Sequence, residues 1–415
     1  MKLQQLFLRN SLIYLIASIA VGVIPFIFIP ILTNILEPQE LGKIGLLELC
    51  IAFSFPVISL GLHGALNVEF FNLKKEDFSS YVFSASILPI FMGGISIVAL
   101  WSAFYFLEIE FALPLNWLVL ILIIAINQFF YQTWLVITQC EKRPIAYGLM
   151  QFFMVLLNFG LSLVFITEFN LDADGRLYGL LVAYLIVGIL SVIFLLRGGY
   201  LTLNLNLNYL LGALKYGVPL IPHLIGGMSI VYLDRYFIAE QLGAEKLGIY
   251  IVAVQMAFSL ILIQNALNQA IIPFVFEKLG LRTIEADKIV SKLFFGYILF
   301  MGVTTILLCL SSQYIYEYFI DYKYQASQEL VKYLAFSMFI LSCSKIPINI
   351  ILFEKKTYLL SFAAIISISC GWVVFDYFIS KEGLRGAVIA SMILSLVTLV
   401  IVSIFSFRIR KIKWI

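Results

Sequence analysis

The candidate functional residues of this sequence are the charged residues that lie within long apolar stretches. Asp234 and Arg235 are adjacent in the stretch 215–248, among apolar and aromatic residues, and Lys345 lies in another apolar stretch. Hydrocarbon strongly disfavours ionised groups, so these side chains are expected to face protein or a water-filled cavity rather than lipid. A guanidinium or ammonium group in such a cavity offsets the cost of removing an anion from water. The sequence therefore indicates that each of these charges faces either a water-filled cavity or a partner within the protein.

The depth of each ionisable residue in its stretch sets what it can contact. Lys345 precedes Glu354 by nine residues, which at ~1.5 Å per residue places it roughly 13 Å from that end and close to the membrane midplane. Arg235 lies nearer a turn, where it either pairs with Asp234 or another neighbour or faces the cavity. Glu48 lies inside the second stretch; it either pairs with Arg235 or Lys345 or takes up a proton, and the sequence does not choose between these roles.

Neutral polar residues extend the candidate cavity. His223 falls in the middle of a stretch that Pro219 and Pro222 interrupt, where it is either a hydrogen-bonded packing residue or a functional one. Gln128 and Gln132 are spaced i, i+4, so they share one face of a helix. Such amides either join helices to one another or form a polar wall that can hydrogen-bond hydroxyl groups.

Composition places the whole chain in a membrane. Of the 415 residues, 62% are hydrophobic and only 12% are charged, whereas soluble domains carry about 25% charged residues. The net charge of +3 gives no support to nucleic-acid binding. The five cysteines lie in apolar stretches without the spacing of a disulfide framework or a zinc site. Enzyme signatures are absent from the sequence, so we expect neither catalytic residues nor a cofactor.

Twelve apolar stretches are long enough to span a bilayer, which takes about 20 residues. They cover roughly residues 11–36, 41–67, 80–107, 113–140, 145–167, 176–196, 212–239, 246–274, 290–312, 327–353, 358–379 and 384–407. The connections are short, so we expect an all-α membrane protein without a separate soluble domain. The stretch 11–36 is too long for a signal peptide and is interpreted as a retained membrane helix.

The distribution of Lys and Arg predicts the orientation. With the N-terminus in the cytoplasm, 18 of the 27 Lys and Arg residues fall in cytoplasmic segments and six on the opposite side. The other three, Arg235, Lys332 and Lys345, lie inside or near spans. Positive residues concentrate on the cytoplasmic side of membrane proteins. Both termini are therefore expected in the cytoplasm.

A weak repeat divides the chain into halves. Leu36-x4-Leu41-Gly42 follows the first stretch, and Leu242-x4-Leu247-Gly248 follows the seventh. Both stretches are also broken, the first by Pro25 and Pro30 and the seventh by Pro219, Pro222 and the pair Gly226–Gly227; these breaks are candidate hinges. We therefore expect two six-helix bundles, residues 1–198 and 212–415, joined by a cytoplasmic linker of residues 199–211.

These motifs together resemble a known family. Pro25-Phe26-x3-Pro30-x-Leu32-Thr33 and its Leu-Gly continuation, and Gly217-x-Pro219-x2-Pro222 leading to Leu233-Asp234-Arg235-Tyr236, are similar to the O-antigen (Wzx-type) flippases. These belong to the multidrug/oligosaccharidyl-lipid/polysaccharide exporter superfamily. The resemblance covers the whole chain. It implies a MATE-like fold and a cationic cavity between the bundles. Asp234 and Arg235 match the motif of the seventh span, whereas Lys345 matches none and is included for its depth.

The resemblance also implies a function. Such a flippase carries undecaprenyl diphosphate-linked oligosaccharide repeat units across the bacterial inner membrane by alternating access, for O-antigen or another surface polysaccharide. Its expected partners are this lipid-linked substrate, membrane lipid, a glycan polymerase and a chain-length regulator. Coupling to H+ or Na+ is left open.

Two other functions remain as alternatives. A multidrug exporter of the same fold would need acidic residues to bind cationic drugs, and here Glu48 stands almost alone against Arg235 and Lys345. A membrane glycan polymerase or glycosyltransferase would need a large outer loop with catalytic residues, which the sequence lacks.

Overall fold

The computed structural model describes residues 22–108, 113–356 and 358–410, and helices make up nearly all of them. After an apolar helix over Gly22–Ile35, the first half contains α2 (Pro38–Ser59), α3 (Leu62–Asn72), α4 (Lys75–Phe106), α5 (Leu115–Cys140), α6 (Pro144–Thr167), α7 (Asp172–Arg197) and α8 (Leu207–Gly217). The second half contains the 3-10 turn η1 (Val218–Leu220), α9 (Ile221–Leu281), α10 (Ile284–Phe319), the 3-10 turn η2 (Tyr322–Ser327), α11 (Gln328–Cys343), α12 (Lys345–Phe353), α13 (Tyr358–Glu382) and α14 (Leu384–Ile409). The predicted all-α membrane fold is confirmed.

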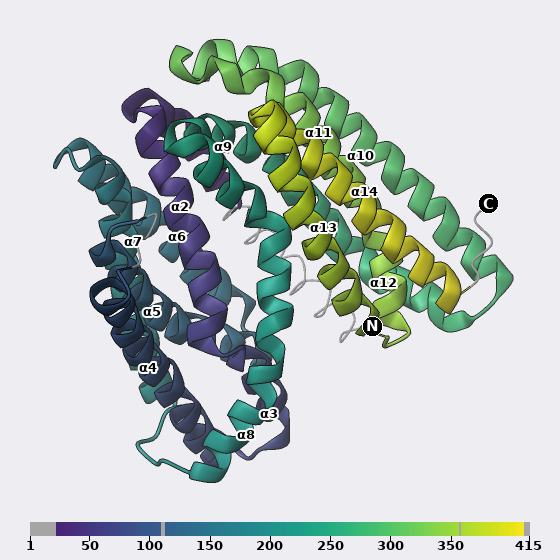
Figure 1. Ribbon diagram of the computed structural model, residues 1–415. Helices are drawn as coiled ribbons and strands as arrows, with labels where there is room; N and C mark the ends of the chain where they lie inside the picture. The colour runs from purple at the N-terminus through teal and green to yellow at the C-terminus, as the bar shows by residue number, and fades with distance from the viewer. Residues whose placement is uncertain (1–21, 109–112, 357, 411–415) are drawn as a thin grey trace. The chain divides into compact units, whose positions relative to one another are not determined.

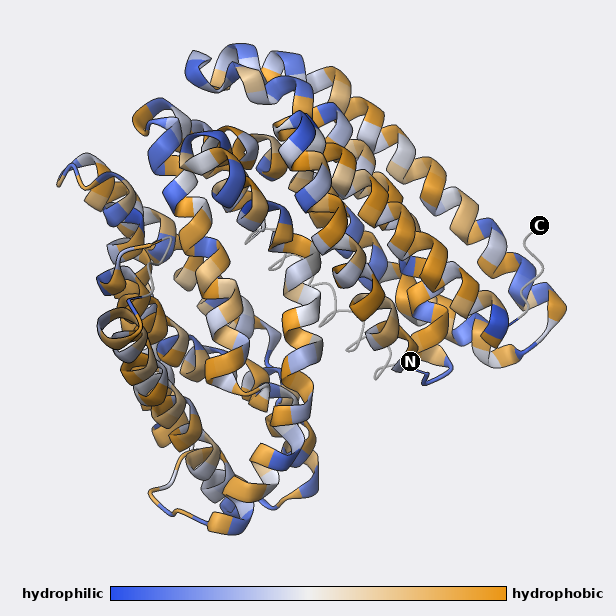
Figure 2. Cartoon of the chain, viewed as in Figure 1, coloured by the Kyte–Doolittle hydropathy of each residue, from blue (hydrophilic) through white to orange (hydrophobic). Residues whose placement is uncertain are grey.

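Ten helical segments of the described residues are long and apolar enough to cross a membrane. One of them, Val231–Gln269, covers parts of two predicted stretches, 212–239 and 246–274. The chain turns between these parts at Gly243, with φ 85° and ψ 171°, a conformation open to glycine. The helix Gly22–Ile35 is the described part of the first predicted stretch. Figure 2 shows apolar residues along these helices and polar residues gathered at many of their ends.

Two predicted interruptions are absent. Pro25 and Pro30 lie inside the continuous helix Gly22–Ile35. The pair Gly226–Gly227 lies inside α9, whose helical backbone continues from Ile221 to the turn at Gly243. The break in this region comes earlier, at η1, where Pro219 cannot donate a backbone hydrogen bond. Glycine lowers helix propensity by only about 1 kcal/mol. Proline is also tolerated in membrane helices where neighbouring groups satisfy the freed carbonyl, as Pro56 inside α2 and Pro89 inside α4 show.

The described residues form two compact units, and their boundaries differ from the predicted ranges 1–198 and 212–415. The described part of unit 1 contains residues 43–108 and 113–228, and that of unit 2 contains Gly22–Gly42 together with residues 229–356 and 358–410. The linker and α8 belong to unit 1, because α8 packs against α3 and α4. The end of the first apolar stretch belongs to unit 2.

Unit 1 is built on helix pairs with small residues at their contacts. α7 packs against α5 and α6, and Gly179 of α7 lies so close to Ser162 of α6 that a Cβ would collide with its backbone. A second apolar core joins α3, α4 and α5 around Leu66, Phe78 and Phe129, all of them buried. Without a hydrophobic driving force in lipid, such close approach is a main source of helix association.

Unit 2 is built on the hairpin of α13 and α14, which run side by side in Figure 1. α11 packs against both α10 and α14, and the buried hydroxyl groups of Ser337 on α11 and Ser395 on α14 lie 2.9 Å apart. The segment that ends the helix Gly22–Ile35 is bound here too: the hydroxyl of Tyr324 donates to the carbonyl of Leu36 at 2.9 Å, and Lys323 pairs with Glu37 at 3.1 Å.

The Leu-x4-Leu-Gly repeat is a pair of reciprocal contacts within unit 2. Gly42 lies against the carbonyl oxygen of Ala244, and Gly248 lies against the carbonyl oxygen of Pro38. Pro38 and Ala244 occupy the same position of the two repeats, two residues after the leading leucine. Each repeat therefore supplies a glycine that the backbone of the other repeat approaches, which explains why both copies carry one.

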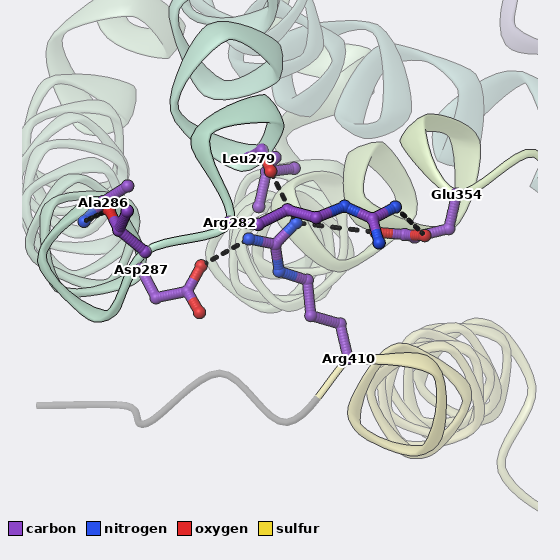
Figure 3. A network of polar contacts seen from close by, with 7 residues as sticks. Leu279, Arg282, Ala286, Asp287, Glu354 and Arg410 are labelled. Carbon is purple, nitrogen blue, oxygen red and sulfur yellow. Dashed lines mark hydrogen bonds and ion pairs between the residues drawn. The ribbon is translucent and has the colours of Figure 1, made fainter.

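Arg410 connects the ends of several helices on one side of unit 2 (Figure 3). Its guanidinium donates to Asp287 of α10 at 2.7 Å and to the carbonyl of Leu279 at the end of α9 at 2.8 Å. Glu354, after α12, lies 3.5 Å from Arg410 and 3.7 Å from Arg282. The end of α14 is thus connected to the ends of three other helices.

We expect Arg410→Ala to lower the thermal unfolding midpoint of the purified protein by several degrees. The Arg410 side chain is 11% exposed, so the change removes charge-assisted hydrogen bonds worth about 2 kcal/mol in a partly buried setting. For a unit of this size, that is a fall of ~4–8 °C. Arg408→Ala is the matched control, because Arg408 is exposed and has no ion pair among the described residues. Equal midpoints for the two variants would contradict the role of Arg410.

Candidate functional site

Asp234 and Arg235 are held inside unit 2 by contacts with α9 itself. One carboxylate oxygen of Asp234 accepts from the backbone N–H of Arg235 at 2.7 Å, and the other accepts from the hydroxyl of Tyr250 at 2.8 Å. Arg235 is 3% exposed, and its guanidinium carbon lies 4.4 Å from the centre of the Tyr232 ring. A guanidinium over an aromatic face is a favourable arrangement that is stronger out of water. Tyr250 lies beyond the turn at Gly243, so that turn brings its hydroxyl back to Asp234.

Asp234 also faces a small cavity whose walls are mostly apolar. The cavity has a volume of about 50 Å³ and is lined in part by hydroxyl groups from α11 and α14: Ser337, Ser391, Ser395 and Thr398. One water molecule needs ~10–15 Å³ on this measure, whereas small-molecule sites measure ~300–1,000 Å³. The cavity therefore has room for a few water molecules or a small cation, and it is too small for a sugar.

Lys345 lies at a break in the helical backbone. α11 ends at Cys343 and α12 begins at Lys345, with the buried Ser344 between them donating its hydroxyl to the carbonyl of Leu341 at 2.6 Å. The Lys345 side chain is half-buried and has neither an ion pair nor a hydrogen bond with another described residue. It is not among the residues that line the Asp234 cavity. Lys345 thus lies on a broken helix of unit 2. Among the described residues, no acidic side chain pairs with its charge.

Glu48 belongs to unit 1, where its partner is Arg176. The two side chains lie 3.8 Å apart, and Arg176 also donates to Asn158 at 2.5 Å and to Ser162 at 3.0 Å. The Arg176 side chain is 5% exposed, and its guanidinium stacks on Phe159 at 4.7 Å. The sequence leaves open whether Glu48 pairs with Arg235 or Lys345 or takes up a proton; in the structure it pairs with a third cation, Arg176. The network holds α2, α6 and α7 together, which is a structural role.

The remaining predicted residues are also placed in single units. Gln128 and Gln132 lie on α5 of unit 1, and the side-chain carbonyl of Gln128 is buried without a hydrogen-bond partner among the described residues. Buried amides rarely lack partners, so a water molecule or a ligand group is expected at this oxygen. His223 lies on α9, but its side chain is outside the described part of the structure.

Comparisons with known proteins connect this architecture to a family. The family model described as "Polysaccharide biosynthesis protein" matches residues 7–278, about two thirds of the chain. The chain belongs to that family. A curated relative, "Lsg locus putative protein 1" of Haemophilus influenzae, is 25% identical over 296 residues, 70% of this chain and 71% of the relative. The resemblance of the motifs to polysaccharide flippases is therefore confirmed at the level of the family.

Solved structures confirm the MATE-like fold. An inward-facing multidrug resistance transporter of the MATE family, in the MOP superfamily, superposes with a TM-score of 0.69 at 16% identity, covering 97% of this chain and 99% of that structure. A mutant of the MATE transporter VcmN of Vibrio cholerae gives 0.61 at 13% identity, covering 99% and 98%. This family member is a multi-pass membrane protein with the fold of a transporter along nearly its whole length.

Sequence reasoning missed Arg176 and Arg410. The charge distribution assigns Arg410 to a cytoplasmic segment and Arg176 to the opposite side, and their acidic partners Glu48, Asp287 and Glu354 come from distant parts of the chain. A signal was present for Arg176, since it follows an acidic run and precedes a long apolar stretch. No signal in the sequence pairs Arg410 with Asp287.

Proposed function

We propose that this protein is a flippase for a lipid-linked saccharide. It moves an undecaprenyl diphosphate-linked oligosaccharide repeat unit from the cytoplasmic to the outer leaflet of the bacterial inner membrane by alternating access. The product serves the assembly of O-antigen or another surface polysaccharide. The observation that carries the proposal is that a chain of the polysaccharide biosynthesis family has a transporter fold over 97% of its length. A transporter in such a pathway moves a saccharide intermediate.

Charge chemistry supports an anionic substrate. The diphosphate loses its water shell when it leaves the membrane surface, and a cation in the protein offsets that loss. Lys345 and Arg235 are the cations within the spans of unit 2 that fit this role. The buried amide of Gln128 and its neighbour Gln132 in unit 1 suit the hydroxyl groups of the saccharide.

Energy coupling is part of the proposal. We assign coupling to H+ or Na+ to Asp234, because its carboxylate faces a cavity of about 50 Å³ with four hydroxyl-bearing side chains. Glu48 is not assigned this role, because its charge is matched by Arg176 at 3.8 Å. Both termini lie in the cytoplasm in this proposal, and a glycan polymerase and a chain-length regulator act on the product.

A multidrug exporter is the second candidate, since the solved structures of this fold include multidrug transporters. The charges oppose it. Cationic drugs need acidic groups, and of Glu48 and Asp234, the first pairs with Arg176 and the second adjoins Arg235 and faces a cavity too small for a drug.

Deletion of the gene tests both functions. In a strain that makes the surface glycan, we expect lipid-linked repeat units to accumulate on the cytoplasmic face, measured by their protection from an added glycosidase in intact spheroplasts. Drug tolerance is expected to stay unchanged on deletion and on overexpression. Normal glycan export in the deletion strain would refute the flippase proposal, and a loss of drug tolerance would favour the exporter.

A further inference from the structure

Unit 1 contains a second cavity, separate from the Asp234 cavity. It has a volume of about 470 Å³ and lies between α3, α4 and α8. That volume falls within the ~300–1,000 Å³ range of small-molecule sites and is about nine times the volume of the Asp234 cavity. The function proposed above assigns it no role.

Three tyrosines give this cavity aromatic walls. Tyr81 of α4 is 5% exposed, and the ring of Tyr209 on α8 lies edge-on to it with centroids 5.8 Å apart. Tyr216 lines the cavity as well, and its ring packs beside Gly64, where a Cβ would lie 3.3 Å away. Tyrosine offers an apolar face together with a hydroxyl group, and three of them suit a ligand with both C–H faces and hydroxyl groups.

Polar groups of both signs lie among these rings. Glu69 of α3 and Asn208 and Lys215 of α8 line the same cavity. Neither the Glu69 carboxylate nor the Lys215 ammonium forms an ion pair or a side-chain hydrogen bond with another described residue. Partial desolvation and the nearby Asp77 carboxylate raise the pKa of Tyr209, which keeps its hydroxyl protonated. The cavity thus offers a carboxylate acceptor, an amide and a cation that the protein does not use for itself.

The helical period of α8 explains how these residues meet. Asn208, Gly212 and Lys215 are spaced i, i+4, i+7 and so share one side of the helix, with Tyr209 and Tyr216 beside them. Leu207 and Leu211, at 66% and 61% exposure, point elsewhere. α8 begins where the side chain of Asn206 accepts from the backbone N–H of Asn208 at 2.9 Å, which fixes the register of this wall.

We propose that this cavity binds the sugar and the adjoining phosphate of a phosphorylated saccharide. The sugar ring packs on the tyrosines, Glu69 and Asn208 hydrogen-bond its hydroxyl groups, and Lys215 binds a phosphate oxygen. The proposal rests on the flippase function and extends it: the cavity is a loading site that holds the saccharide headgroup before translocation. Lys215 lies in a segment that the charge distribution places in the cytoplasm, where the substrate is made.

Gly212 allows the cavity to be filled without disturbing the fold. It lines the cavity, and a Cβ added to it would meet no atom within 4 Å. We expect Gly212→Leu to reduce glycan export about 10-fold or more, with a normal level of folded protein. Gly160→Leu is the matched control, since Gly160 of α6 has the same open surroundings but lies outside the cavity. Glu69→Gln and Lys215→Gln are expected to reduce export in the same way.

Photo-cross-linking in the full-length protein decides the ligand. A photoreactive phenylalanine analogue replaces Gly212 in one strain and Gly160 in another, and cells are labelled with a radioactive sugar. We expect label at position 212 but not at 160. Label that persists in washed membranes identifies a lipid-linked saccharide, and label that requires added hexose 1-phosphate identifies a free sugar phosphate.

The outcomes separate the two proposals. If deletion traps lipid-linked repeats but position 212 captures only phospholipid or nothing, the loading site is wrong and the flippase function stands. Equal export by Gly212→Leu and Gly160→Leu also overturns the loading site. If deletion traps no repeats, the flippase function fails, whatever position 212 captures.

Discussion

Alanine at Gly42 or Gly248 is expected to destabilise the protein strongly, whereas alanine at Gly94 is expected to be stabilising. A Cβ on Gly42 would overlap the carbonyl oxygen of Ala244, and a Cβ on Gly248 would overlap that of Pro38. Backbone atoms cannot move aside as a flexible side chain does, so the two segments must separate. Overpacking of this kind costs more than about 3 kcal/mol, which corresponds to a fall of ~10 °C in Tm.

Gly94 gives a matched control with the opposite sign. It lies in α4, and a Cβ added there would meet nothing within 4 Å. Alanine exceeds glycine in helix propensity by about 1 kcal/mol, so Gly94→Ala should raise Tm by a few degrees. Thermal unfolding in detergent, followed by size-exclusion chromatography, measures all three variants. A Tm for Gly42→Ala equal to that of Gly94→Ala would show that the repeats do not pack closely.

These glycines show what the sequence could and could not predict. The Leu-x4-Leu-Gly repeat is visible in the sequence, and it predicts two related halves. Why glycine stands there is not visible, because the reason is a contact between segments about 200 residues apart. The apolar stretches were predictable because each helix must satisfy its own backbone in lipid, which is a local requirement.

Charge pairing is the part of the site that depends on tertiary structure. Glu48 and Arg176 are separated by more than a hundred residues, and only the folded chain brings their side chains to 3.8 Å. The same holds for Arg410 and its acidic contacts on α10 and after α12. By contrast, the contact of Asp234 with the backbone N–H of the next residue is local. The position of Asp234 inside an apolar stretch can be predicted from the sequence. A sequence thus indicates which charges are buried better than it indicates their partners.

The boundary between the two units also depends on tertiary structure. Composition marks 199–211 as a linker, because its asparagines interrupt the apolar residues between two longer apolar stretches. The structure places α8 with unit 1, since its buried Ala213 joins a core with Leu66 and Phe78. Local polarity therefore located the connection but could not tell which unit α8 packs on.

Replacing Lys345 by alanine is expected to reduce glycan export about 30-fold or more while raising the stability of the protein. The half-buried ammonium has no acidic partner among the described residues, so it costs stability that its removal would return. Export depends on the same charge if it offsets the desolvation of the diphosphate, and losing such a contact costs about 2 kcal/mol or more. Lys345→Arg keeps the charge and should retain most of the export.

The opposite signs of the two effects make this prediction decisive. Lys332 of α11 is the matched control: it is exposed and likewise lacks an ion pair among the described residues. Lys332→Ala should change neither export nor Tm. A fall in both export and Tm for Lys345→Ala would assign Lys345 a structural role, and unchanged export would remove it from the substrate path. A fall in export together with a rise in Tm is the combination that a charge held for the substrate produces, because the protein then maintains it at the expense of its own stability.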